Sequence, residues 1–175
     1  RATRPCGRRP VVRRAQLTLA AMPATWQYPH QDLGEPVHVD GSPVLRPVVP
    51  LIITDGIPAV LGVLDSGSPI SVANADVFAP LGIDLDSDEP TYEIPLSVGG
   101  GFERTPVFLV DLELRPPAGT HQPNARWRLH LGARRRWRLP FAVLLGQRGW
   151  FDTFPTRIDA TNSTVELPWS LGAQQ

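Results

Sequence analysis

Alternation of apolar and polar side chains is the clearest pattern along this chain, and it predicts β-strands. From Phe108 to Leu114 every second side chain is apolar, and most of those between are polar. Residues 126–131 alternate Arg or His with Trp and Leu in the same way. Because successive side chains of a strand point to opposite faces, each segment offers one apolar face to a core.

Short apolar runs bounded by turn residues predict further strands. Asp55-Gly56 separates two such runs and is typical of a hairpin turn, and the Gly99–Gly101 stretch would form the tip of another hairpin. A closing hairpin should turn near Asn162. The runs lie at residues 48–54, 59–64, 91–98, 102–115, 142–146 and 156–167.

Two segments favour helical turns. Residues 68–85 combine a short strand with a helix-like stretch, for which Ser71 or Asn74 is a candidate N-cap and Gly82 lies near the end. Residues 147–154 have the length of one or two helical turns. Strands outnumber these segments by several to one, so we expect an all-β fold with one or two short helices.

Composition supports the same fold class. The 175 residues include 20 Pro and 15 Gly, which favour turns and leave little room for long helices. A chain of this length is typical of one domain with tails. We expect a basic tail at residues 1–21, an extended lead-in at 22–44, the folded domain at 45–168 and a C-terminal tail at 169–175.

Basic charge is concentrated at the start of the chain. All 17 basic residues are Arg, six of them lie within residues 1–14, and no acid precedes Asp32. Without residues 1–21, the remaining 11 Arg and 17 acids give a net charge of −6 with His neutral. Three interpretations of this tail are open: a disordered tail, a secretory signal interrupted by polar residues, or sequence upstream of a true start at Met22, which we favour.

Cysteine and histidine content argues against a metal site. Cys6 is the single cysteine, and the four His are scattered without ligand spacing, so we expect no bound metal. No apolar run reaches the ~20 residues that span a bilayer. We expect no membrane association and a cytoplasmic location, with secretion left open.

The stretch Val63-Leu64-Asp65-Ser66-Gly67-Ser68 is the leading candidate for chemistry. It places an ionisable carboxylate directly after an apolar strand and before a Ser-Gly turn. Taken alone, such an aspartate most often hydrogen-bonds its own turn. The same position would also hold a catalytic carboxylate rigidly, because a strand end fixes its backbone and Gly67 lets amide groups approach it.

Three motifs in this order resemble the retropepsin family of aspartic proteases. They are Val63–Ser68, then Val98-Gly99-Gly100-Gly101, then Val143-Leu144-Leu145-Gly146-Gln147-Arg148. The resemblance covers about residues 45–168, and residues 143–154 are similar to the bacterial cellular branch of the family. It implies a closed-barrel-like, all-β fold and an aspartic endopeptidase that needs no cofactor.

The resemblance also implies residue roles. Asp65 would be the catalytic acid, supported by Ser66, Gly67 and Ser68. Peptide or protein substrate would bind under a mobile hairpin, the flap, with Val98, Gly99, Gly100 and Gly101 at its tip. Leu144, Leu145 and Gly146 would form the floor beneath the catalytic loop. The chain has one Asp-Ser-Gly and no Asp-Thr-Gly, so the active form would be a homodimer with an Asp65 from each subunit.

One departure from the family and one rival function accompany this interpretation. Viral members carry an acid four positions after the catalytic Asp that pairs with an Arg of the late motif, but here that position is Pro69, which leaves Arg148 without the expected partner. The rival function is a catalytically inactive dimerisation or peptide-binding module of the same fold.

The arginine-rich segment 126–138 has two further interpretations. We expect it to form a hairpin that turns at Gly132–Arg135, with a second strand at residues 137–141. Its Arg and Trp side chains could bind nucleic acid through phosphate contacts and stacking. A solvated hairpin face with buried Trp127 and Trp137 is the favoured interpretation, so we expect no nucleic-acid partner.

Overall fold

The computed structural model describes residues 25–98 and 101–168. The predicted tails at residues 1–21 and 169–175, and the flap glycines Gly99 and Gly100, lie outside the described residues. Within the described ranges, no helix is long and apolar enough to cross a bilayer.

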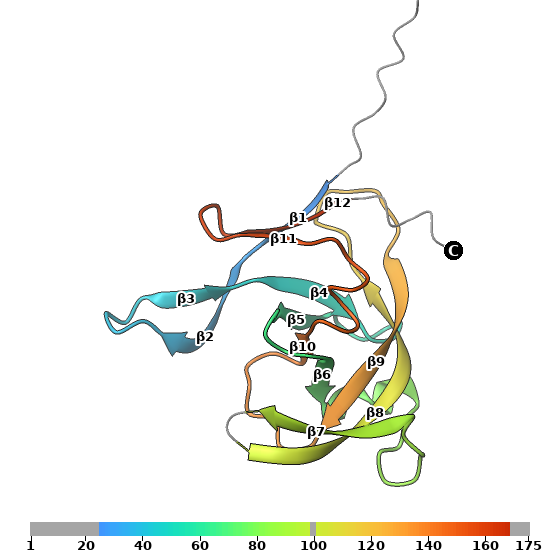
Figure 1. The fold of residues 1–175 in the computed structure, drawn as a ribbon. Coiled ribbons are helices and arrows are strands. Elements are labelled where there is room, and N and C mark those ends of the chain that lie inside the picture. Colours follow the sequence, from blue (N-terminus) through green and yellow to red (C-terminus); the bar gives the residue numbers. More distant parts are fainter. Residues whose placement is uncertain (1–24, 99–100, 169–175) are drawn as a thin grey trace, which may run out of the picture.

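A sheet of seven strands closes into a barrel, as expected for an all-β, closed-barrel-like fold (Figure 1). Six of the strands form the ring, because the first of them pairs with its neighbour on one side and with the last on the other. In order around the ring they are β4 (Val48–Ile52), β5 (Val60–Leu64), β10 (Val143–Leu145), β6 (Ser71–Asn74), β9 (Ala125–Arg134) and β8 (Gly101–Leu114). The seventh strand, β7 (Tyr92–Val98), extends the sheet as the hairpin partner of β8.

Five more strands lie outside the barrel. β1 (Thr25–Pro29), β12 (Thr164–Pro168) and β11 (Arg157–Asp159) form a three-stranded sheet, and β11 and β12 are the predicted closing hairpin. β2 (Gln31–Val37) and β3 (Pro43–Arg46) form a hairpin that projects from the body (Figure 1). The predicted lead-in therefore contains strands, and β1 ties it to the end of the folded region.

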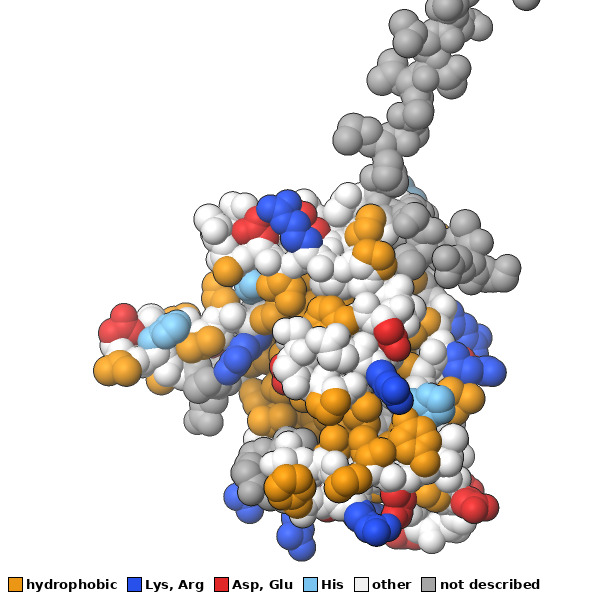
Figure 2. All heavy atoms as spheres, in the orientation of Figure 1, with side chains coloured by type: hydrophobic (Ala, Val, Ile, Leu, Met, Phe, Trp, Pro, Cys, Tyr) orange, Lys and Arg blue, Asp and Glu red, His pale blue; other side chains and the backbone are white. Residues whose placement is uncertain are grey.

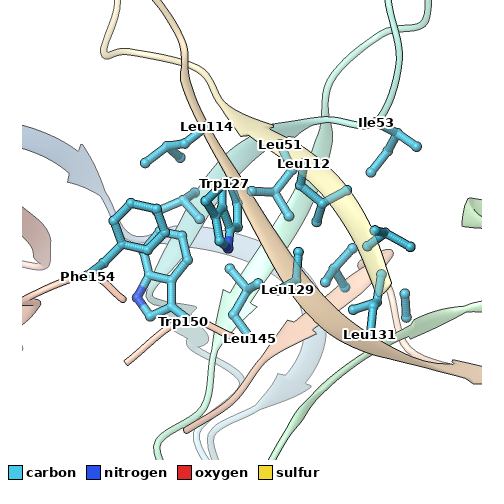
Figure 3. Close-up of a cluster of buried hydrophobic side chains, with 14 of the residues drawn as sticks. Leu51, Ile53, Leu112, Leu114, Trp127, Leu129, Leu131, Leu145, Trp150 and Phe154 are labelled. Carbon is cyan, nitrogen blue, oxygen red and sulfur yellow. The ribbon is translucent and has the colours of Figure 1, made fainter. Parts of the chain in front are cut away.

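Strands β8 and β9 build the core with the alternation that their sequences predicted. Phe108, Val110, Leu112 and Leu114 are buried on one face of β8, and Leu109 on the other face is exposed. The core continues into an aromatic group at one end of the barrel (Figure 3). There the ring centroid of Phe154 lies 5.0 Å from that of Trp127 and 4.5 Å from that of Trp150.

A second, smaller hydrophobic cluster lies between the barrel and the β7–β8 hairpin. Its buried members are Ile70, Val72, Leu96 and Val107. Trp137 and Leu144 are among the partly buried side chains that pack against it. This cluster matters for the site, because Leu96 belongs to the hairpin whereas Ile70 and Leu144 flank the Asp65 region.

The predicted hairpin turn at Gly132–Arg135 is wrong. β9 continues through Arg134, because residues 131–134 pair in parallel with Ser71–Asn74 of β6. The chain turns in the next segment, residues 135–142, which contains no strand. The prediction failed because the alternating pattern ends at Leu131, whereas parallel pairing with β6, a strand distant in sequence, extends β9 to Arg134.

The predicted helical segments had mixed outcomes. Two single-turn 3₁₀ helices, η1 (Ala75–Val77) and η2 (Ala79–Leu81), follow β6, with Asn74 as the N-cap of η1 and left-handed Gly82 (φ 77°) ending η2. Residues 147–154 form turns and no helix. A helix cannot pass through Gly149, whose φ is 98°.

A pair of Phe→Ala substitutions tests the position of the core. Phe154 is 2% exposed and Phe102 is 85% exposed. Phe154→Ala should lower the free energy of unfolding by about 3–5 kcal/mol, since it leaves a cavity among aromatic rings. Phe102→Ala should change it by less than about 0.5 kcal/mol. Urea denaturation measures both, and equal losses would contradict this placement of the core.

Candidate active site

The main chain of Asp65 is anchored where two parallel strands end together. Leu64 of β5 lies opposite Leu145 of β10 in the parallel register. The amide of Asp65 donates a 2.9 Å hydrogen bond to the carbonyl of Leu145. The carbonyl of Asp65 accepts a 3.1 Å bond from the amide of Ser68, which closes a tight turn. The predicted catalytic loop and the predicted floor are thus directly joined.

One oxygen of the Asp65 carboxylate is held by the loop itself. Its Oδ1 accepts a 2.9 Å hydrogen bond from the amide of Gly67. The φ of Gly67 is not left-handed, so a glycine is favoured here because of the limited space. A Cβ at this position would lie 3.1 Å from Oδ1 of Asp65. Asp65 is partly exposed and Ser66 and Gly67 are exposed. The carboxylate is therefore oriented by the protein and remains accessible, so it can come within hydrogen-bond reach of a bound molecule.

Gly146 allows the floor to pass close behind the loop. A Cβ at this position would lie 2.3 Å from the carbonyl oxygen of Ile70 and 2.8 Å from that of Ser68. These are backbone atoms that a side chain cannot push aside without moving the loop. The amide of Gly146 donates to the hydroxyl of buried Ser71 at 3.1 Å, which fixes the crossing.

Gln147 holds the loop from the side, a role that the sequence analysis missed. Its side-chain amide donates a 2.6 Å hydrogen bond to the carbonyl of Ser66, the residue next to Asp65. Its main-chain amide donates to the carbonyl of Ser68 at 2.8 Å. The available signal was its position directly after Leu145-Gly146, where any polar side chain would face the loop.

Arg148 is attached to the loop through its backbone. Its amide donates to the carbonyl of Pro69 at 3.2 Å, and its own carbonyl accepts bonds from both the amide and the hydroxyl of Ser71. Its guanidinium is exposed and forms no ion pair with any described residue. Position 69, where the viral members carry an acid, is occupied by Pro69.

The predicted flap lies in the β7–β8 hairpin, and this hairpin contacts the site region. Val98 pairs with Gly101 as the last strand pair before the tip. Leu96 packs in the same cluster as Ile70 and Leu144. Arg134 lies beneath the hairpin and is 6% exposed, with Nη1 3.5 Å from the Leu96 carbonyl oxygen and Nη2 3.4 Å from Glu103 Oε2. The predicted turn at Gly132–Arg135 would leave this arginine solvated, whereas it is buried.

The face of β9 that carries arginines is occupied by ion pairs. Arg128 forms a 2.9 Å ion pair with Asp111, and its hydrogen bond holds the pKa of that carboxyl below the usual value. Trp127 is buried and donates from Nε1 to the carbonyl of Gly149. A buried Trp127 cannot stack on a base, which removes one support for nucleic-acid binding. In the described part of the chain, no group of three or more His, Cys, Asp or Glu could hold a metal ion.

Two Gly→Ala substitutions test the close approach at the floor. Gly146→Ala forces a methyl group against the Ile70 carbonyl, so it should lower the free energy of unfolding by at least about 1–3 kcal/mol and speed hydrogen exchange in residues 65–70. Gly56→Ala adds a methyl group in open space at a left-handed φ of 81° and should lower stability by about 1–2 kcal/mol. It should leave exchange in residues 65–70 unchanged, and unchanged exchange with Gly146→Ala as well would contradict the described contact.

Comparison with known proteins gives structural likeness without sequence support. No protein-family model matches the chain, and no curated protein matches it either. Similar solved structures include a retropepsin-like aspartic protease from Rickettsia conorii, at 16% identity and a TM-score of 0.48, covering 83% of this chain and 92% of that one. Another is the retroviral protease-like domain of Ddi1 from Leishmania major, at 15% identity and a TM-score of 0.45, covering 75% of this chain and 99% of that one. Likeness this distant leaves the assignment of function to the geometry of the site.

Proposed function

We propose that the protein is an aspartic endopeptidase of the retropepsin kind that acts as a homodimer. The observation that carries the proposal is the support given to Asp65. Its main chain is bonded to Leu145, one carboxylate oxygen accepts from Gly67, and Gln147 holds the neighbouring residue. A turn aspartate would need only the Gly67 bond, whereas a catalytic carboxylate needs the additional anchoring from a second strand.

A second copy of the chain would complete the site. Among the described residues, no second carboxylate is bonded to Asp65, and the chain has no second Asp-Ser/Thr-Gly. A twofold axis beside the loop would bring two Asp65 side chains together. The Ser66 hydroxyl, which is exposed and bonded to no described residue, would then be free to bond the loop of the second subunit.

The paired carboxylates would act as acid and base. Two close carboxylates share one proton, because like charges at short distance do not both ionise. The ionised Asp65 takes a proton from water, whose oxygen attacks the peptide carbonyl carbon, and the protonated Asp65 gives its proton to the carbonyl oxygen. The tetrahedral intermediate then breaks at the C–N bond, and a proton passes to the leaving amine.

Substrate would lie extended between the hairpin and the floor. Main-chain pairing with the flap residues Val98–Gly101 would give affinity, and pockets for alternate side chains would give selectivity. Leu144, Leu145 and Gly146 would support this arrangement from below. A cytoplasmic location and membership of the bacterial cellular branch remain predictions.

One observation favours the rival function, a peptide-binding module without catalysis. Within the described residues, β7 pairs only with β8, so its outer edge is available to an added strand. A peptide could bind there by main-chain pairing and remain uncleaved. This function would not require a charged Asp65.

Substitution of Asp65 separates the two functions. Asp65→Asn should lower peptide cleavage at least about 100-fold, since the dyad loses its acid–base pair, and should leave peptide binding largely intact. Asp55→Asn, at an exposed turn, is the matched control and should cleave like the parent. New termini from a peptide mixture, read by mass spectrometry from acidic to neutral pH, give the rates. If parent and Asp65→Asn cleave equally, or both stay inactive as confirmed dimers, the endopeptidase proposal is wrong.

A further inference from the structure

The arginines of the described residues divide into two groups according to their partners. Six form ion pairs: Arg104 with Glu93, Arg126 and Arg128 with Asp111, Arg134 with Glu103, Arg135 with Asp86, and Arg157 with Asp159 and Glu166. Five have no acidic partner among the described residues: Arg46, Arg115, Arg136, Arg138 and Arg148. Four of these five lie in segments next to the proposed site.

Arg148 and Arg46 lie in segments that are hydrogen-bonded to residues on either side of the catalytic loop. Arg148 is bonded through its backbone to Pro69 and Ser71, immediately after that loop. On the other side, the Leu64 amide donates to the Pro47 carbonyl at 2.9 Å. Asp65 follows Leu64 in one segment, and Arg46 precedes Pro47 in the antiparallel segment beside it.

Arg136 and Arg138 flank Trp137 in the segment after β9. Trp137 packs against the cluster that contains Ile70 and Leu96, so the segment lies against the β7–β8 hairpin. Both arginines are exposed. In Figure 2, arginine side chains lie on both sides of an apolar surface between the β2–β3 and β7–β8 hairpins. The loop between β5 and β6 lies between the same two hairpins in this view (Figure 1).

We propose that these four arginines bind acidic side chains of a peptide on both sides of its cleaved bond. The inference rests on the proposed function, and in a homodimer each arginine occurs twice, once on either side of the axis. A shared-proton dyad carries one negative charge, and the chain after residue 21 has a net charge of −6, so an acidic peptide would otherwise be repelled. Three of these arginines are exposed and Arg46 is half-buried, and without acidic partners among the described residues they offset this repulsion locally.

The acid nearest to Arg148 in sequence is committed elsewhere. Asp152 Oδ1 accepts hydrogen bonds from the amide of Gly149 and the hydroxyl of Thr153. That carboxylate stabilises its own turn and forms no ion pair with Arg148. A carboxylate of a bound peptide would give this guanidinium the acidic partner that it lacks among the described residues, and Arg binds carboxylates through two parallel hydrogen bonds.

Binding is measured with the full chain carrying Asp65→Asn, so that peptides stay intact. The probes are two fluorescent peptides with the same apolar centre, flanked on both sides by Glu in one and by Gln in the other. Fluorescence anisotropy should show tighter binding of the Glu peptide at low salt, and the difference should shrink toward about 0.3 M salt. Adding Arg148→Gln should weaken the binding of the Glu peptide by roughly threefold to fivefold and leave the binding of the Gln peptide unchanged.

Arg115→Gln is the matched control. Arg115 is also exposed and unpaired among the described residues, but its amide is bonded to Pro50 on the side of β4 away from β5. All of the variants carry the same six arginines in residues 1–14, so any attraction between these arginines and the peptide is the same in every measurement. Thermal unfolding followed by circular dichroism checks that the variants are folded. Equal binding of the two peptides, or equal weakening by Arg115→Gln and Arg148→Gln, would overturn the proposal.

Cleavage by the unsubstituted chain separates this inference from the function on which it rests. Cleavage of both peptides with equal kcat/KM would overturn the charge preference and leave the endopeptidase in place. Charge-selective, Arg148-dependent binding without any cleavage would support the arginine site and reject the endopeptidase. Faster cleavage of the Glu peptide, reduced by Arg148→Gln, would support both.

Discussion

The hydrogen bond from the Asp65 amide to the Leu145 carbonyl is the constraint on which the site depends. It exists because β5 and β10 run parallel and end at the same level, although the sequence separates them by most of the barrel. Parallel neighbours cannot be joined by a tight turn, so this arrangement needs the intervening strands to bring them together. The closed barrel therefore places β10, which comes late in the sequence, beside the Asp65 loop, which comes early.

The close approach of the two segments explains the residue types around Asp65. With β10 so near, the chain after it must cross behind the loop, and only a residue without a Cβ fits at position 146. That crossing places Gln147 and Arg148 against the loop, where their amides take up the carbonyls of Ser68 and Pro69. The crossing segment thus supplies hydrogen bonds to carbonyl groups that the tight loop would otherwise leave unbonded.

Sequence patterns were sufficient for elements with strong alternation or clear turn residues. The buried faces of β8 and β9 and the closing hairpin were predicted correctly for this reason, and Asn74, one of two candidate N-caps, caps η1. The strands in residues 25–46 were missed as elements, since Pro and Gly mask any period there. The roles of Gln147, Ser71 and Arg134 depend on contacts between distant segments, which no local pattern records. The pairing of two Asp65 residues depends on a second molecule.

The pairing of β4 with β8 has a consequence for folding. Leu51 and Leu114 are opposite each other where the ring closes, and β5, β6 and β7 all lie between them in the chain. Closing such a long loop loses conformational entropy before the contact stabilises anything, so topologies of this kind reach their native state slowly. A nascent chain released before β8 would expose unpaired strand edges, and those edges are where misassembly between chains begins.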